Sequence, residues 1–212
     1  MLRFVTDHRS GWLVHLARVV SDVGAVGVLG ALAVIAGITL WFLRARLVVA
    51  LTPAIALGVA GVCAAVVKQL VGRARPPVGL RLVHETEASF PSGHTTDSTA
   101  VLVAVALVLA VCFLDSAKVR ALAVAGAGLL AAAIGGSRLE LGVHWPTDVL
   151  AGYALGLAIA VTVTTVAVLV SRVSPPSADP SHRHGRLLRL MSIERQAPSG
   201  FRHVEFSPAA GV

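Results

Sequence analysis

Polar and charged side chains at residues 137–148 interrupt a strongly apolar sequence, between two long runs without charge. This stretch contains Arg138, His144 and Asp148. Pro146 favours the first position of a helix, which would leave His144 just outside that helix and Asp148 in its first turn. A carboxylate there can accept one imidazole N–H and leave the other ring nitrogen free. Because an arginine fork suits phosphate oxygens, the stretch predicts an imidazole nucleophile or base that faces a phosphoryl group.

A loop at the membrane surface, with charges that are only solvated, would produce the same short pattern. The same two interpretations apply to Lys68 and Arg75, which are separated by six residues after the second apolar run. They could be flanking charges that anchor a helix end, or cations that offset the charge of a phosphate. Arg73 and Arg81 are interpreted as flanking or lipid-headgroup charges.

A further motif, Pro91-Ser92-Gly93-His94, opens the third apolar run. Ser92 is a suitable N-cap, and Asp97 suits the positive end of the same helix. The N-terminus of a helix is a natural anion site, and Gly93 has no side chain to block the approach of an anion. Taken alone, His94 could equally be an ordinary residue at the start of a helix.

The composition is that of a membrane protein. Of the 212 residues 56% are hydrophobic and 14% are charged, and the mean hydropathy is +0.81, whereas roughly 25% charge is usual in a soluble domain. The net charge is +7, but the basic residues lie between apolar runs, which favours membrane topology and anion binding over a nucleic-acid partner. Cys63 and Cys112 lie inside apolar runs and are interpreted as small buried hydrophobic residues.

The predicted fold is all-α, a polytopic bundle of about five transmembrane helices. Residues 1–22 combine apolar and charged side chains at near-helical spacing, which predicts an amphipathic helix at the membrane interface. Residues 23–171 form the transmembrane domain, and residues 172–212 are a predicted disordered basic tail. Runs without charge that are long enough, or nearly so, to cross a bilayer occupy residues 23–43, 47–67, 98–114, 121–136 and 149–171.

Short basic turns predict the orientation. Arg44 and Arg46 share one side of the bundle with Lys118, Arg120 and the basic tail. By the positive-inside rule this side is cytoplasmic. The polar motifs then meet on the extracytoplasmic face of the cell membrane.

Taken together, the three motifs resemble the type 2 phosphatidic acid phosphatase (PAP2) family, the membrane lipid phosphatases related to vanadium haloperoxidases. The resemblance covers about residues 23–171 and holds in motif order and spacing. It implies that Lys68, Arg75 and Arg138 bind the phosphoryl oxygens. It also implies that Ser92 and the backbone N–H of Gly93 add donors at the start of a helix.

The resemblance also assigns the catalytic roles. His144 would attack phosphorus and form a phosphohistidine, and Asp148 would orient the imidazole. His94 would act as general acid for the leaving oxygen and then as base for the hydrolytic water. No metal or other cofactor is implied, because cationic side chains do the work that a metal does elsewhere.

The expected function is therefore an integral-membrane, metal-independent phosphatase for a lipid phosphate or diphosphate. Candidate substrates are polyprenyl diphosphate, phosphatidic acid and phosphatidylglycerol phosphate. One alternative is an enzyme like the vanadium haloperoxidases, since the same cationic site holds vanadate. Another is a protein that binds or transports lipid phosphates without catalysis, although a carrier needs no nucleophile or acid. The oligomeric state stays open.

Overall fold

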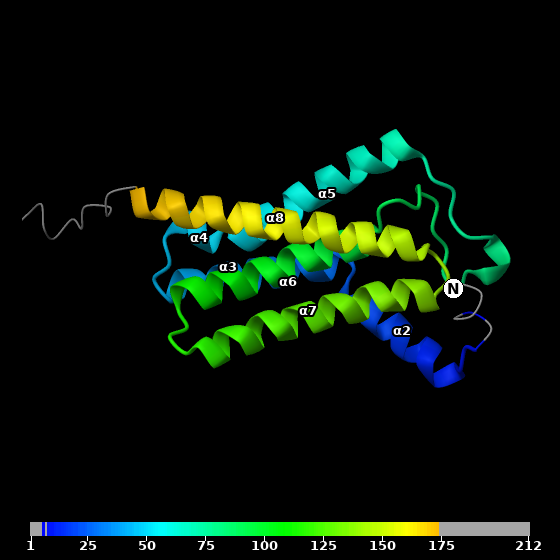
Figure 1. Ribbon diagram of the computed structural model, residues 1–212, viewed down its shortest axis with the longest axis horizontal. Helices are drawn as coiled ribbons and strands as arrows, with labels where there is room; N and C mark the ends of the chain where they lie inside the picture. Colours follow the sequence, from blue (N-terminus) through cyan, green and yellow to red (C-terminus); the bar gives the residue numbers. More distant parts are fainter. Residues whose placement is uncertain (1–5, 7, 174–212) are drawn as a thin grey trace, which may run out of the picture. The chain divides into compact units, whose positions relative to one another are not determined.

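A computed structural model describes residue 6 and residues 8–173, so the predicted tail lies, apart from its first two residues, outside the described part of the chain. Within that part the secondary structure is helical, as predicted (Figure 1). A short 3₁₀ helix, η1, covers Val78–Leu80. The α-helices are α2 Gly11–Val23, α3 Val26–Phe42, α4 Leu47–Ala50, α5 Thr52–Val71, α6 Gly93–Cys112, α7 Ala117–Glu140 and α8 Pro146–Val173.

Four or five of these helices can cross a membrane, which confirms the predicted multi-pass bundle. Helices α5, α6, α7 and α8 are each long and apolar enough, and α2 with α3 forms a fifth candidate that is bent by 52°. Helix α3 has 17 residues, fewer than the roughly 20 that span the hydrocarbon core. Helix α2 leaves Trp12 and Leu16 exposed, which fits the predicted interfacial helix.

Several helix boundaries differ from those predicted. The second apolar run is broken at Leu51, where the single turn of α4 ends and α5 begins. Pro53 lies in the first turn of α5, where its missing N–H is tolerated. Helix α5 continues past Lys68, and α7 continues through Arg138. Charged side chains do not end these helices, because they find partners inside the protein.

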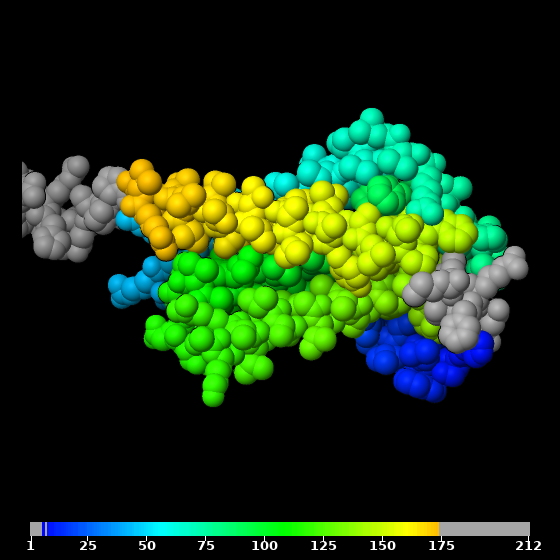
Figure 2. All heavy atoms as spheres, viewed as in Figure 1, coloured from blue at the N-terminus to red at the C-terminus, as the bar shows by residue number. Residues whose placement is uncertain are grey.

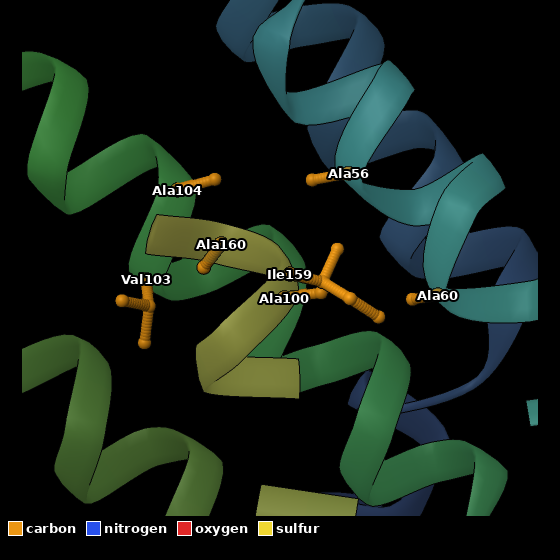
Figure 3. Close-up of a cluster of buried hydrophobic side chains, with 7 residues drawn as sticks. All are labelled: Ala56, Ala60, Ala100, Val103, Ala104, Ile159 and Ala160. Carbon is orange, nitrogen blue, oxygen red and sulfur yellow. The ribbon is translucent and has the colours of Figure 1, made fainter. Parts of the chain in front are cut away.

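Helix α6 is the central helix, and it packs against α5, α7 and α8. Figure 2 shows the side chains of α8 lying along those of α6 and α7 on one face of the bundle. Small side chains allow this close approach, which association of helices in lipid favours. The core cluster of α5, α6 and α8 consists of Ala56, Ala60, Ala100, Val103, Ala104, Ile159 and Ala160 (Figure 3).

The helix ends that carry the predicted motifs meet at one end of the bundle. The C-termini of α5 and α7 lie there with the N-termini of α6 and α8 and the loop at residues 72–92 (Figure 1). Helix α2 lies at the same end. The charged side chains are therefore positioned by four helix ends and one loop.

The packing of α6 on α8 predicts the effect of filling the contact at Gly156. An added Cβ would lie 2.5 Å from the carbonyl oxygen of Thr96 and 2.7 Å from Cβ of Thr99. We expect Gly156→Ala to lower the free energy of unfolding by about 1–3 kcal/mol. Gly126→Ala on α7 is the matched control, because no atom lies within 4 Å of its added Cβ. Thermal unfolding in detergent measures both variants, and equal melting temperatures would contradict the close packing.

Candidate active site

A cavity of about 360 Å³ lies at this end of the bundle. Both predicted catalytic histidines, His94 and His144, line it, so they face one space on one side of the membrane. The predicted phosphate ligands Lys68, Arg75 and Gly93 line it too. The other lining residues are Gly24, Val26, Gly61, Ala64, Ala65, Glu85, Glu87 and Asp97.

His144 lies in the turn between α7 and α8 and is almost completely buried. Its Nδ1 is 2.9 Å from the carbonyl oxygen of Ser89 and 3.5 Å from Oδ2 of Asp148. Both neighbours are acceptors, so Nδ1 carries the proton and Nε2 keeps its lone pair. Nε2 faces Nη1 of Arg75 at 3.2 Å. The available nitrogen therefore points toward a cation that can bind an anion.

Asp148 is fully buried in the first turn of α8, as predicted, but it binds more than the imidazole. Its Oδ1 accepts a hydrogen bond from Arg73 at 2.8 Å, and Oδ2 accepts from the backbone N–H of Trp145 at 2.8 Å and from the hydroxyl of Ser89. The guanidinium of Arg73 also lies over the Trp145 ring, 5.7 Å from its centroid. Ser89 thus contacts both members of the His144–Asp148 pair.

The two predicted phosphate-binding arginines share one carboxylate, Glu85. Nη2 of Arg138 donates to Oε1 of Glu85, and Nη2 of Arg75 lies 3.5 Å from its Oε2. The side chains of Arg75 and Arg138 are only 4% and 3% exposed. Arg75 is fixed further by donation to the carbonyl oxygens of Glu87 and Val143, at 2.7 and 3.0 Å. A nearly buried cation needs a partner, and Glu85 supplies the negative charge that a phosphate would bring.

Lys68 reaches the N-terminus of α6. A Cβ added to Gly93 would lie 3.8 Å from its Nζ, which also pairs with Oε2 of Glu87 at 2.5 Å. Ser92 differs from its predicted role: it does not line the cavity. Its Oγ accepts a hydrogen bond from Thr95, and its backbone N–H donates to the carbonyl oxygen of Asp148. Ser92 therefore joins α6 to α8, and Gly93 is the member of this pair that lines the cavity.

The surroundings set the charges of the loop and turn residues. Burial lowers the pKa of His144, and the charges of Arg75 and Arg138 lower it further against the hydrogen bond to Asp148. Burial alone would raise the pKa of Glu85, but the charges of Arg138 and Arg75 outweigh it and hold that pKa below its ordinary value. Near neutral pH the site therefore holds a neutral imidazole beside a charged carboxylate and two guanidinium groups.

Helix α2 contributes to the site, which the sequence did not indicate. Nη1 of Arg138 donates to Oγ of Ser21 at 2.6 Å, and Arg9 donates to the carbonyl oxygens of Glu140 and Leu80. A Cβ added to Gly24 would lie 3.4 Å from Cδ2 of His94. Helix α2 therefore orients Arg138 through Ser21, and Gly24, directly after α2, lines the cavity. Arg138 itself is not among the lining residues.

Five residues with polar contacts in the site were not predicted, and they differ in whether the sequence could have identified them. Glu85 and Glu87 follow from charge balance, since buried cations need counter-ions when no substrate is bound. Arg73 is adjacent to a predicted motif but was interpreted as a flanking charge. The positions of Ser21 and Ser89 give no signal in the sequence, because tertiary contacts alone bring them to the site.

The pairing of Glu85 with both arginines predicts how the site binds a free anion. We expect Glu85→Gln to bind inorganic phosphate more tightly, because the anion no longer competes with a fixed carboxylate for the two guanidinium groups. The dissociation constant is measured by calorimetry in detergent. Asp115→Asn, an exposed acid in the turn between α6 and α7, is the control. Weaker phosphate binding by Glu85→Gln would contradict this account.

The contact between Arg75 and His144 predicts a pKa change. Burial and neighbouring cations hold the pKa of His144 below its ordinary 6.5. We expect Arg75→Gln to raise this pKa, because removing a positive charge favours the protonated imidazole. Titration of ¹⁵N-histidine-labelled protein by NMR measures it, with Arg120→Gln at the opposite end of the bundle as the control. An unchanged or lower pKa in Arg75→Gln would contradict the contact.

Comparison with known proteins agrees with this geometry. The family model of the PAP2 superfamily matches residues 47–172. Phosphatidylglycerophosphatase B of Bacillus subtilis is 36% identical over 70% of this chain and 72% of its own length. Decaprenylphosphoryl-5-phosphoribose phosphatase of Mycobacterium tuberculosis is 33% identical over 51% of this chain and 55% of its own length.

A solved structure agrees as well. A transmembrane PAP2-type phosphatidylglycerolphosphate phosphatase from Bacillus subtilis aligns with a TM-score of 0.74 and 31% identity, over 82% of this chain and 85% of that one. The family model spans all three motifs. The chain belongs to the PAP2 superfamily, among its membrane lipid phosphatases, and is a multi-pass phosphoric ester hydrolase.

Proposed function

We propose that the protein removes the terminal phosphate of a lipid through a phosphohistidine at His144. The observation that carries this proposal is the unprotonated Nε2 of His144, which accepts a hydrogen bond from Arg75 at 3.2 Å in the cavity that Lys68 and His94 also line. In the bound state the phosphate oxygens contact Arg75, Arg138, Lys68 and the N–H of Gly93. These donors are fixed before the substrate binds, so they stabilise the transition state without reorganisation.

The proposed reaction has two steps. The Nε2 lone pair of His144 forms a bond to phosphorus while the bond to the leaving oxygen breaks, and His94 gives that oxygen a proton. A water molecule then attacks phosphorus and gives its proton to His94, while the bond between phosphorus and Nε2 of His144 breaks and inorganic phosphate leaves. Asp148 holds the imidazole and stabilises its positive charge, and Arg73 and Ser89 hold Asp148.

Among the three candidate substrates we propose phosphatidylglycerol phosphate first. The names of the Bacillus subtilis relative and of the solved structure identify this phosphatase activity. Phosphatidic acid and polyprenyl diphosphate are the competing substrates. The relatives are named as phosphatases, which favours phosphate hydrolysis over the halide oxidation of the haloperoxidase alternative.

We propose that the active site faces the outside of the cell membrane. The segment between α3 and α4, with Arg44 and Arg46, and the start of α7, with Lys118 and Arg120, lie at the end of the bundle opposite the cavity. By the positive-inside rule, short basic loops of this kind favour the cytoplasmic side.

Removal of the nucleophile tests the mechanism. We expect His144→Ala to lose at least about 10⁴-fold in turnover of phosphatidylglycerol phosphate in detergent with EDTA present. Wild-type protein given substrate labelled in the terminal phosphate should retain label after an alkaline quench, and His144→Ala should retain none. His15→Ala on the exposed face of α2 is the control. Undiminished turnover by His144→Ala would overturn the mechanism.

A further inference from the structure

Asp97 is an acid in the same cavity that the proposed reaction does not use. It lies in α6 beyond the first turn, which in the structure contains no acidic residue, and it lines the cavity together with His94. Residues three apart in a helix share one face. Asp97 therefore lies on the face of α6 that also presents the proposed general acid.

One carboxyl oxygen of Asp97 has no hydrogen-bond partner in the described part of the chain, whereas the other acids of the cavity form ion pairs. This oxygen, Oδ1, is buried, and the acids that pair with cations at short distance are Glu85 and Glu87. A buried acceptor that lacks a hydrogen bond costs about 1–3 kcal/mol. Asp97 lines the cavity, so its carboxyl is placed to accept a hydrogen bond from a molecule there, and such a ligand would offset this cost.

The place of Asp97 identifies which part of a substrate it meets. His144 and Arg75 lie at the loop end of the cavity, and Asp97 lies about 4.5 Å beyond His94 along the axis of α6. Because His94 is the proposed donor to the leaving oxygen, the group attached to that oxygen extends toward Asp97. Gly61 and Ala64 of α5 line the cavity as well, and their small side chains leave room for a headgroup.

We infer that Asp97 binds a hydroxyl of the leaving alcohol, on the carbon next to the ester carbon. The preferred substrates are then lipids whose phosphorylated headgroup is a polyol. A second phosphate at this place would be repelled by the negative charge of Asp97, which disfavours lipid diphosphates. This inference rests on the proposed phosphatase reaction and adds which leaving alcohol the site prefers.

A matched pair of substrates tests the inference. Phosphatidylglycerol phosphate carries the hydroxyl, and its deoxy analogue lacks only that group. We expect the wild type to prefer the hydroxyl-bearing lipid in kcat/KM, by about ten- to a hundredfold for a hydrogen bond to a charged acceptor. Asp97→Leu should lose this preference and hydrolyse the two lipids equally, with the rate on the deoxy analogue unchanged or higher.

Two further variants separate binding of a hydroxyl from a general charge effect. Asp97→Asn keeps an oxygen acceptor, so it should retain part of the preference. If Asp97 acted only through its negative charge, as a counter-ion for Lys68, Asp97→Asn and Asp97→Leu would have the same effect. Asp115→Ala, an exposed acid outside the cavity, is the control. If Asp97→Leu slowed both lipids equally, or kept the full preference, the inference would be overturned while the phosphatase reaction stands. A wild type that hydrolyses neither lipid would overturn both proposals.

Discussion

Two guanidinium groups that are almost buried at a membrane boundary set the main constraint on this protein. Arg75 and Arg138 have side chains that are 4% and 3% exposed, and a cation withdrawn from water needs an anionic partner. In the structure Glu85 is that partner for both. In the reaction that we propose, a phosphate in the cavity offers negative charge and oxygen acceptors in place of Glu85, so binding would exchange one anion for another and leave neither arginine unpaired.

Rigid helix ends hold these groups in place. The cavity is lined by α5, the start of α6, the loop at residues 72–92 and His144 in the turn between α7 and α8, and small side chains let α6 pack closely against its neighbours. Close packing of this kind tolerates little displacement. The donors that we propose for a phosphate are therefore held in place by the helix bundle, and fixed donors contribute more to catalysis than mobile ones.

Segments outside the long spanning helices complete the site. The loop at residues 72–92 supplies the contacts that orient Asp148, and α2 supplies a hydroxyl to Arg138 through Ser21. Because Ser21 of α2 orients Arg138, α2 is connected to the proposed phosphate binding. His144 also contacts the loop through Ser89. The position of the imidazole therefore depends on its own turn, on the loop at residues 72–92 and on Asp148 of α8.

The sequence determined the class of fold and the residues whose side chains can take part in a reaction, because both follow from local sequence patterns. Long uncharged runs require helices in a bilayer, and three spaced motifs identified residues such as His144 and Arg138. It did not determine the partners of those residues: Glu85, Arg73 and Ser21 acquire their contacts only when loop and helices meet. Helix continuation past a charge was also missed, since that charge is tolerated only where tertiary neighbours pair it. Pairing of buried charges depends on distances between residues far apart in the chain, and only the tertiary structure fixes those distances.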